Sequence, residues 1–175
     1  MKIGPKYKIA RRLGAAVFDK TQTAKFAASV ARRSGGKDGK KKPRPKSGFG
    51  TQLIEKQKAR FTYGVMEKQF RNYVRKAIAQ TKLHPDEALF RALETRLDNV
   101  VYRLGLANSR LLARQMVSHG HILVNGTRVT IPSYTISEKD AITIRDGSQK
   151  KKLFEQAAEK MKNAPAVNWI KSESE

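Results

Sequence analysis

The stretch "SRLLARQMVSHGHILVNGTRV" (residues 109–129) decides the fold, because it combines signals for a short helix, a helix stop and a β-hairpin. Asn108 or Ser109 can cap a helix over 109–118. Gly120 can end that helix in the left-handed conformation. The residues expected on its inner face are Leu112, Met116 and Val117.

The second half of this stretch predicts a hairpin. Asn125-Gly126 joins two β-rich runs, and both central positions of a type I′ turn need positive φ, which Asn and Gly tolerate. Two more short strands are expected over 134–136 and 141–145, separated by "SEKD". We therefore predict a small antiparallel sheet after the helix.

Helical periodicity dominates the preceding residues. Residues 51–80 are predicted to form two helices broken near 62–64, with Thr62 as N-cap of the second. His84-Pro85-Asp86 starts a helix that runs to Gly105. The apolar face of the helix before this break is expected to consist of Met66, Phe70, Tyr73, Val74, Ala77 and Ile78. The core of the helix after it is expected to hold Leu89, Leu93, Leu97, Val100, Val101 and Leu104.

These elements predict an α+β fold, with a helical N-terminal domain and a small module of two helices packed on a short antiparallel sheet. The expected divisions are a basic, partly extended N-terminal extension (1–50), a helical domain (51–92) and the module (93–148). A polar helix is expected near 151–163, and the C-terminal helical segment (151–175) can also belong to the helical domain.

Charge indicates the class of partner. The chain has 175 residues and a formal net charge of +22, and its first fifty residues hold 15 basic and two acidic residues. Such an excess is normally taken up by a polyanion, usually nucleic acid. The Gly-, Pro- and Lys-rich residues 34–50 are expected to stay extended or disordered until a polyanion neutralises them. No run approaches the roughly 18 apolar residues of a membrane-spanning helix, so no membrane partner is expected. The scarcity of acids near the N-terminus is also compatible with an organelle transit peptide.

Metal binding and catalysis are both disfavoured. The chain has no cysteine, which excludes disulfides and thiolate zinc sites. His119 and His121 flank Gly120, so the helix stop should turn them in different directions, and no third histidine lies nearby in the sequence. No nucleophile–base constellation or glycine-rich phosphate loop is present. We expect no cofactor, no metal and no enzyme activity.

The remaining interpretation is a basic surface for folded RNA. Arg110 and Arg114 lie four residues apart on one helix face, and the hairpin adds Asn125 and Arg128. At least one of the two histidines near Gly120 is expected to contact RNA as well. The candidate RNA-binding residues are Lys2, Lys6, Lys8, Arg11, Arg12, Lys40, Lys41, Lys42, Arg44, Lys46, Lys58, Arg60, Tyr63, Lys68, Arg71, Arg75, Asn108, Ser109, Arg110, Arg114, Gln115, Ser118, His119, His121, Asn125 and Arg128.

The sequence also resembles a known family. "GPKYKIARRLG" (4–14), "EKQKARFTYGVMEKQFRNYVRKA" (55–77) and the stretch from Leu93 to Tyr134 are similar to the bacterial and organellar form of the S-four family of small-subunit ribosomal proteins. The zinc-knuckle cysteines of many members are absent here, and members usually continue beyond the point where this chain ends with "NWIKSESE".

The resemblance implies a structural constituent of the small ribosomal subunit that binds its RNA early and nucleates assembly of the 5′ domain. It also implies neighbouring ribosomal proteins near the mRNA entry channel, a contribution to translational accuracy, and in some members binding to their own mRNA. The expected location is a ribosome, cytoplasmic or organellar. Residues 93–145 would form the RNA-binding module called the alpha-L motif, with the helix over 109–118 facing RNA.

Two other classes stay open at this point. One is an RNA-modifying or stress-related protein with the same small module, which would need a catalytic domain that this length does not accommodate. The other is a nonspecific basic nucleic-acid binder, which would not prefer folded RNA to duplex DNA at equal salt.

Overall fold

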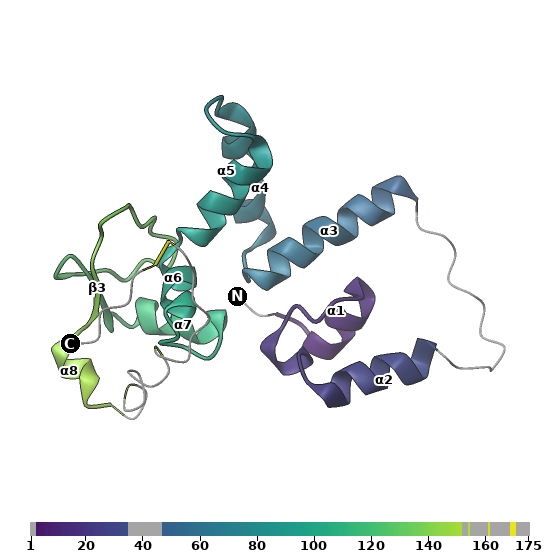
Figure 1. Cartoon of the computed structure of the whole chain (residues 1–175), viewed down its shortest axis with the longest axis horizontal. Helices are drawn as coiled ribbons and strands as arrows, with labels where there is room; N and C mark the ends of the chain where they lie inside the picture. Colours follow the sequence, from purple (N-terminus) through teal and green to yellow (C-terminus); the bar gives the residue numbers. More distant parts are fainter. Residues whose placement is uncertain (1–2, 35–46, 152–153, 155–160, 162–168, 171–175) are drawn as a thin grey trace. The chain divides into compact units, whose positions relative to one another are not determined.

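The computed structural model describes residues 3–34, 47–151, 154, 161 and 169–170. The chain forms two compact units, Met1–Phe70 and Arg71–Glu175, and each has its own hydrophobic cluster. The described elements are helices and one small antiparallel sheet (Figure 1), so the α+β prediction is confirmed.

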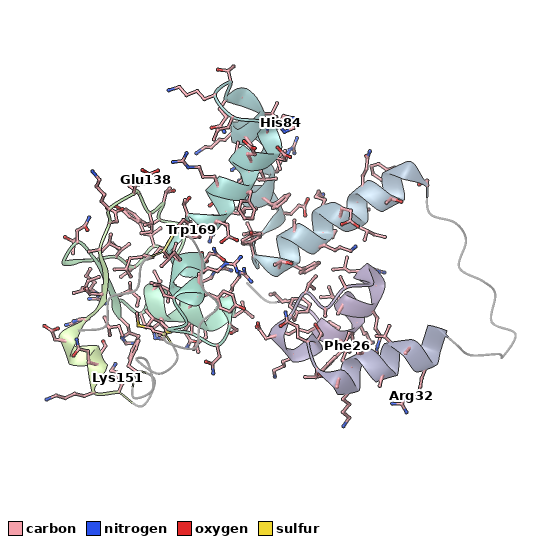
Figure 2. The ribbon with its side chains drawn as sticks, in the orientation of Figure 1. Phe26, Arg32, His84, Glu138, Lys151 and Trp169 are labelled. Carbon is pink, nitrogen blue, oxygen red and sulfur yellow. The ribbon has the colours of Figure 1, made fainter. Side chains whose placement is uncertain are left out.

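The first unit contains helices that the sequence analysis did not identify. They are α1 (Lys6–Leu13), the 3₁₀ turn η1 (Asp19–Thr21) and α2 (Ala24–Ser34). Ala10, Phe18 and Phe26 form a small buried cluster, and Phe61 from α3 packs against it. Figure 2 shows Phe26 among these helices. Part of the predicted extension is therefore a folded helical segment. Residues 35–46, within the Gly-, Pro- and Lys-rich segment 34–50 that we call the predicted linker, lie outside the described residues.

Helix α3 (Gly48–Thr62) begins inside the predicted linker, because the Ser47 hydroxyl accepts a hydrogen bond from the Gly50 amide at 3.2 Å and caps the helix. The predicted break follows, and α4 (Glu67–Ala79) comes next. Thr62 is not the N-cap of α4; its hydroxyl donates to the Lys58 carbonyl at 2.9 Å at the end of α3. The prediction for Thr62 was wrong because a threonine at a helix end can bond backward to its own turn.

The apolar face predicted for α4 is only partly correct. Phe70 and Ala77 are buried, but Met66 is 58% and Ile78 is 66% exposed. Both lie at the limits of the helix, where periodicity no longer shows which side chains the tertiary structure covers.

The second unit begins in α4 and continues through α5 (Pro85–Glu94), α6 (Leu97–Arg103) and α7 (Arg110–Ser118). One continuous helix was predicted over the range of α5 and α6, and that prediction was wrong. The chain breaks at residues 95–96, where the Leu97 amide donates to the Tyr134 carbonyl and the Ile136 amide donates to the Thr95 carbonyl, each at 2.8 Å.

The strand predicted over 134–136 was also wrong, and the same backbone pairing explains why. Thr135 forms an isolated antiparallel bridge with Arg96, and no strand is present at 134–136. The extended backbone of this segment therefore pairs with the α5–α6 break and not with the sheet.

The sheet contains β1 (Ile122–Val124), β2 (Thr127–Arg128) and β3 (Ile142–Ile144) in the antiparallel order β2-β1-β3. Asn125 and Gly126 have φ values of 50° and 77°, which confirms the predicted hairpin. The expected core residues Leu93, Leu97, Val100, Val101 and Leu104 are buried, and Leu89 is half-buried.

The predicted helix α7 is confirmed. The Ser109 hydroxyl accepts a hydrogen bond from the Leu112 amide at 3.3 Å, and Gly120 has φ 70° after the helix. Met116 and Val117 are buried as expected, and Ala113 joins them. Helix α8 (Asp146–Gln149) follows β3, and the helix predicted near 151–163 lies largely outside the described residues.

Candidate nucleic-acid interface

A buried ion-pair network joins α6 to α7. Arg96 and Asp98 have side chains only 3% exposed, and two hydrogen bonds of 3.0 and 2.8 Å join the guanidinium to the carboxylate. Arg114 donates to the same carboxylate through Nε at 2.8 Å and lies within 2.7 Å of it through Nη2. Asp98 therefore holds one arginine from the break before α6 and one from α7.

The charge state of Arg96 follows from these partners. Burial by itself lowers the pKa of an arginine, but the hydrogen bond and charge of Asp98 outweigh burial, and the pKa of Arg96 is raised above its ordinary value. The Tyr73 hydroxyl also accepts from Arg96 at 2.6 Å. Arg96 therefore remains a cation inside the second unit.

A second arm of the network begins at the buried carboxylate of Glu94. Arg103 donates to it twice, at 3.0 and 2.8 Å, and Asn99 donates to it at 2.9 Å. The Asn99 side-chain oxygen accepts from Arg110 Nε at 2.8 Å, and the Arg110 guanidinium lies 4.4 Å from the Tyr102 ring centroid. Helix α6 thus fixes the position of Arg110 as well as that of Arg114.

The two arginines of the predicted RNA face of α7 are also part of this network. Arg110 and Arg114 lie on one helix, as expected, but each guanidinium also bonds to an acceptor on α6. The Arg114 side chain is 21% exposed. No local sequence signal indicates these partners, since Asp98 lies 16 positions before Arg114.

The polar residues around α7 have different environments. Asn108 and Gln115 are exposed, and Ser109 is the helix cap. The Ser118 hydroxyl donates to the Arg114 carbonyl at 2.8 Å. Asn125 bonds to the Asp140 carboxylate at 2.9 Å and to the Ala141 amide at 2.8 Å, so its amide supports the hairpin.

The end of α7 brings the two histidines close to Arg128. The His119 and His121 ring centroids are 6.0 Å apart, and Arg128 Nη2 donates to the His119 carbonyl at 3.3 Å. A Cβ at Gly120 would lie 2.0 Å from Arg128 Nε, so the arginine crosses directly over the glycine. His119 is exposed, whereas His121 is half-buried and its Nδ1 lies 2.9 Å from the Ser148 hydroxyl.

His121 should make the stability of the chain depend on pH. Burial first, and then the charges of Lys151, His119, Arg145 and Arg128, lower its pKa below the ordinary value of 6.5. The folded state then binds fewer protons than the unfolded state, so the contribution of His121 is complete above pH 6.5 and is lost as the pH falls toward the lowered pKa.

We therefore expect His121 to contribute a fall in the free energy of unfolding between pH 7 and pH 5, and His121→Gln to remove that contribution. Denaturant unfolding of wild type and His121→Gln at several pH values measures it. An identical pH slope in wild type and His121→Gln would contradict this assignment.

Helices α3 and α4 carry the second group of candidate cations. Lys68, Arg71 and Arg75 on α4 are exposed, and no described carboxylate lies within ion-pair distance of them. On α3, by contrast, Lys58 pairs with Glu55 at 2.7 Å, and Arg60 lies 3.3 Å from Glu67. Tyr63 is half-buried directly after α3. The exposed α4 cations are therefore the better placed of the two sets to meet phosphate.

Helix α1 presents a third group. Lys8, Arg11 and Arg12 are exposed, whereas Lys6 is half-buried with its Nζ 5.9 Å from the Phe18 ring centroid. Arg11 lies at the same distance from the Phe26 ring. The candidates Lys2, Lys40, Lys41, Lys42, Arg44 and Lys46 lie outside the described residues.

Two features are absent from the described part of the chain. Its His, Asp and Glu side chains form no cluster of three that could hold a metal ion. None of its helices combines the length and the apolar character that crossing a membrane requires.

Family comparisons cover most of the sequence. Residues 1–94 match the ribosomal protein S4/S9 N-terminal domain, and residues 95–142 match the S4 domain. The boundary between the two matches lies at the α5–α6 break, next to Arg96.

Curated relatives agree with these matches. The small ribosomal subunit protein uS4 of Mycobacterium avium (strain 104) is 54% identical over 119 residues, which cover 68% of this chain and 59% of the relative. Its counterpart in Mycobacterium ulcerans (strain Agy99) is 52% identical over 124 residues, which cover 71% of this chain and 61% of the relative. The chain thus spans about three fifths of the length of these relatives. They carry the name of a ribosomal protein and not that of an enzyme, in agreement with the expectation from sequence. The chain belongs to the bacterial S4 family of small-subunit ribosomal proteins.

Proposed function

We propose that the chain is a structural constituent of the small ribosomal subunit that binds the RNA of that subunit. The proposal rests chiefly on the two consecutive family matches, which together cover residues 1–142. The chain has 37 basic and 15 acidic residues. This excess of positive charge supports the proposal, since a ribosomal protein meets a dense array of phosphates. Its expected location is a ribosome, cytoplasmic or organellar.

The proposal extends to finer points that follow from the family resemblance. The chain binds the 5′ domain of the small-subunit RNA as a primary binder and nucleates assembly of that domain. It lies beside other ribosomal proteins near the mRNA entry channel, contributes to translational accuracy, and can bind mRNA. The RNA-binding module corresponds to the predicted region 93–148, and the helical domain supplies further contacts.

The exposed cations of α4 are the part of this surface that a substitution tests most cleanly. We expect Lys68→Gln/Arg71→Gln/Arg75→Gln to weaken binding to small-subunit RNA and to reduce the salt slope by about 3, one for each lost phosphate contact. All three side chains are exposed, so the fold should persist. Filter binding over a salt series measures the slope.

The matched control removes three exposed lysines that are not candidate contacts, Lys25→Gln/Lys82→Gln/Lys139→Gln. It loses the same formal charge, so an equal loss of affinity in the control would show a nonspecific charge effect and contradict the assignment of α4. Competition between folded small-subunit RNA and duplex DNA at equal salt separates the proposed function from a nonspecific basic binder. Equal affinity for the two would favour the nonspecific binder.

A further inference from the structure

Three cationic side chains and one histidine, from different elements, lie near the end of α7. His119 follows α7, Arg128 belongs to β2, Arg145 precedes α8 and Lys151 follows it. We call these four residues the α7-end patch. Arg145 and Lys151 were not among the candidate RNA-binding residues predicted from sequence.

Backbone and side-chain contacts link the members of the patch through His121. The Arg145 amide donates to the His121 carbonyl at 2.9 Å. Ser148 contacts the His121 ring and also accepts, through its carbonyl, a hydrogen bond from the Lys151 amide at 3.0 Å. On the other side, Arg128 bonds to the His119 carbonyl. The three cations and His119 therefore lie near one half-buried imidazole.

In the part of the chain that the structure describes, the cations of the patch lack the acidic partners that other arginines of this unit have. Arg96, Arg103 and Arg114 each form an ion pair with a carboxylate. Within the described residues, no carboxylate lies within 4 Å of a charged nitrogen of Arg128, Arg145 or Lys151. Asp146 follows Arg145 directly but contacts Gln149 instead, at 3.5 Å. All four patch residues are exposed.

The charges of the patch act on the His121 imidazole. Of the charged groups around it, His119 comes from α7, Arg128 from β2, and Arg145 and Lys151 from the two sides of α8; each of them disfavours its protonated form. Among the described residues, its ring also meets two neutral groups, the Ser148 hydroxyl and the Phe154 ring, whose centroid lies 5.8 Å away. A phosphate placed among Arg128, Arg145 and Lys151 would relieve their mutual repulsion.

We propose that the α7-end patch binds backbone phosphates of the ribosomal RNA, so that the RNA contact continues past the end of α7 to Arg145 and Lys151. This rests on the proposed RNA-binding function and deepens it. Arg110 and Arg114 already bond to acceptors on α6, whereas no carboxylate among the described residues pairs with Arg128, Arg145 or Lys151. Phosphate contacts of this kind position RNA without reading its sequence.

The test substitutes Arg145→Gln/Lys151→Gln in the full chain and measures binding to small-subunit RNA over a salt series. Each lost phosphate contact should reduce the salt slope by about 1, so the double variant should lose about 2. Figure 2 shows Lys151 by α8 and Glu138 at the opposite end of the sheet. The matched control is therefore Lys82→Gln/Lys139→Gln, which removes the same charge away from the patch.

The proposal expects a near wild-type slope in the control and a reduced slope in the patch variant, with equal thermal unfolding midpoints for both. Equal slopes in the two variants would overturn the patch. Failure of the wild type to prefer small-subunit RNA to duplex DNA would instead overturn the proposed function. The two failures are distinguishable, because the first compares two variants on one RNA and the second compares two nucleic acids with one protein.

Discussion

Replacing Asp98 by alanine is expected to lower the free energy of unfolding by about 3–5 kcal/mol. Asp98 accepts hydrogen bonds from both Arg96 and Arg114, and Arg96 is as deeply buried as Asp98 itself. Removing the carboxylate leaves the Arg96 guanidinium buried without its counter-charge, and that desolvation cost is no longer offset. Urea unfolding of wild type and variant measures the difference.

The matched control for Asp98 is Glu67→Gln. Glu67 also meets two cations, Lys56 and Arg60, but its side chain is 50% exposed, so its loss should cost no more than about 1 kcal/mol. A loss below about 1 kcal/mol for Asp98→Ala would contradict the role of the network. If Asp98→Ala does not fold, Asp98→Asn can replace it, because asparagine keeps the shape of the side chain. The free energy of unfolding should still fall more in Asp98→Asn than in Glu67→Gln.

The affinity for small-subunit RNA is expected to fall about 10³–10⁵-fold between 50 and 200 mM salt, if about seven phosphates are contacted. Each phosphate that a cation neutralises releases condensed counterions, and added salt opposes that release. The described residues offer enough exposed cations for this count: Lys8, Arg11, Arg12, Lys68, Arg71, Arg75, Arg128, Arg145 and Lys151.

Filter binding with a fixed RNA and a monovalent salt series measures this fall. A change of less than about tenfold over that range would mean that few phosphates are contacted, and would contradict a surface built mainly from cations. The α4 and α7-end variants then show how much of the total slope comes from each of these two surfaces.

The elements that the sequence predicted correctly are those with local causes. Ser109 caps α7, Gly120 ends it, and Asn125-Gly126 turns the hairpin, in each case through residues within a few positions. Such signals do not depend on the rest of the fold. The limits predicted for α7, the hairpin and β3 are therefore nearly correct.

The errors arise where distant segments meet. The break between α5 and α6 depends on backbone hydrogen bonds between residues 95–97 and 134–136, which no periodicity reveals. The bonds from Arg110 and Arg114 to α6 are likewise tertiary. In α1 and α2 the basic composition favoured an extended segment, although Ala10, Phe18 and Phe26 bury a small core. Arg145 and Lys151 were not predicted as RNA-binding residues, because only the fold brings them near His121.

Co-sedimentation with small subunits after a high-salt wash tests whether this chain is an RNA-binding constituent of the small ribosomal subunit. We expect the chain to remain with the small-subunit fraction, because contacts that recognise the shape of folded RNA persist when salt weakens the phosphate contacts. Recovery only in the ribosome-free fraction would contradict it.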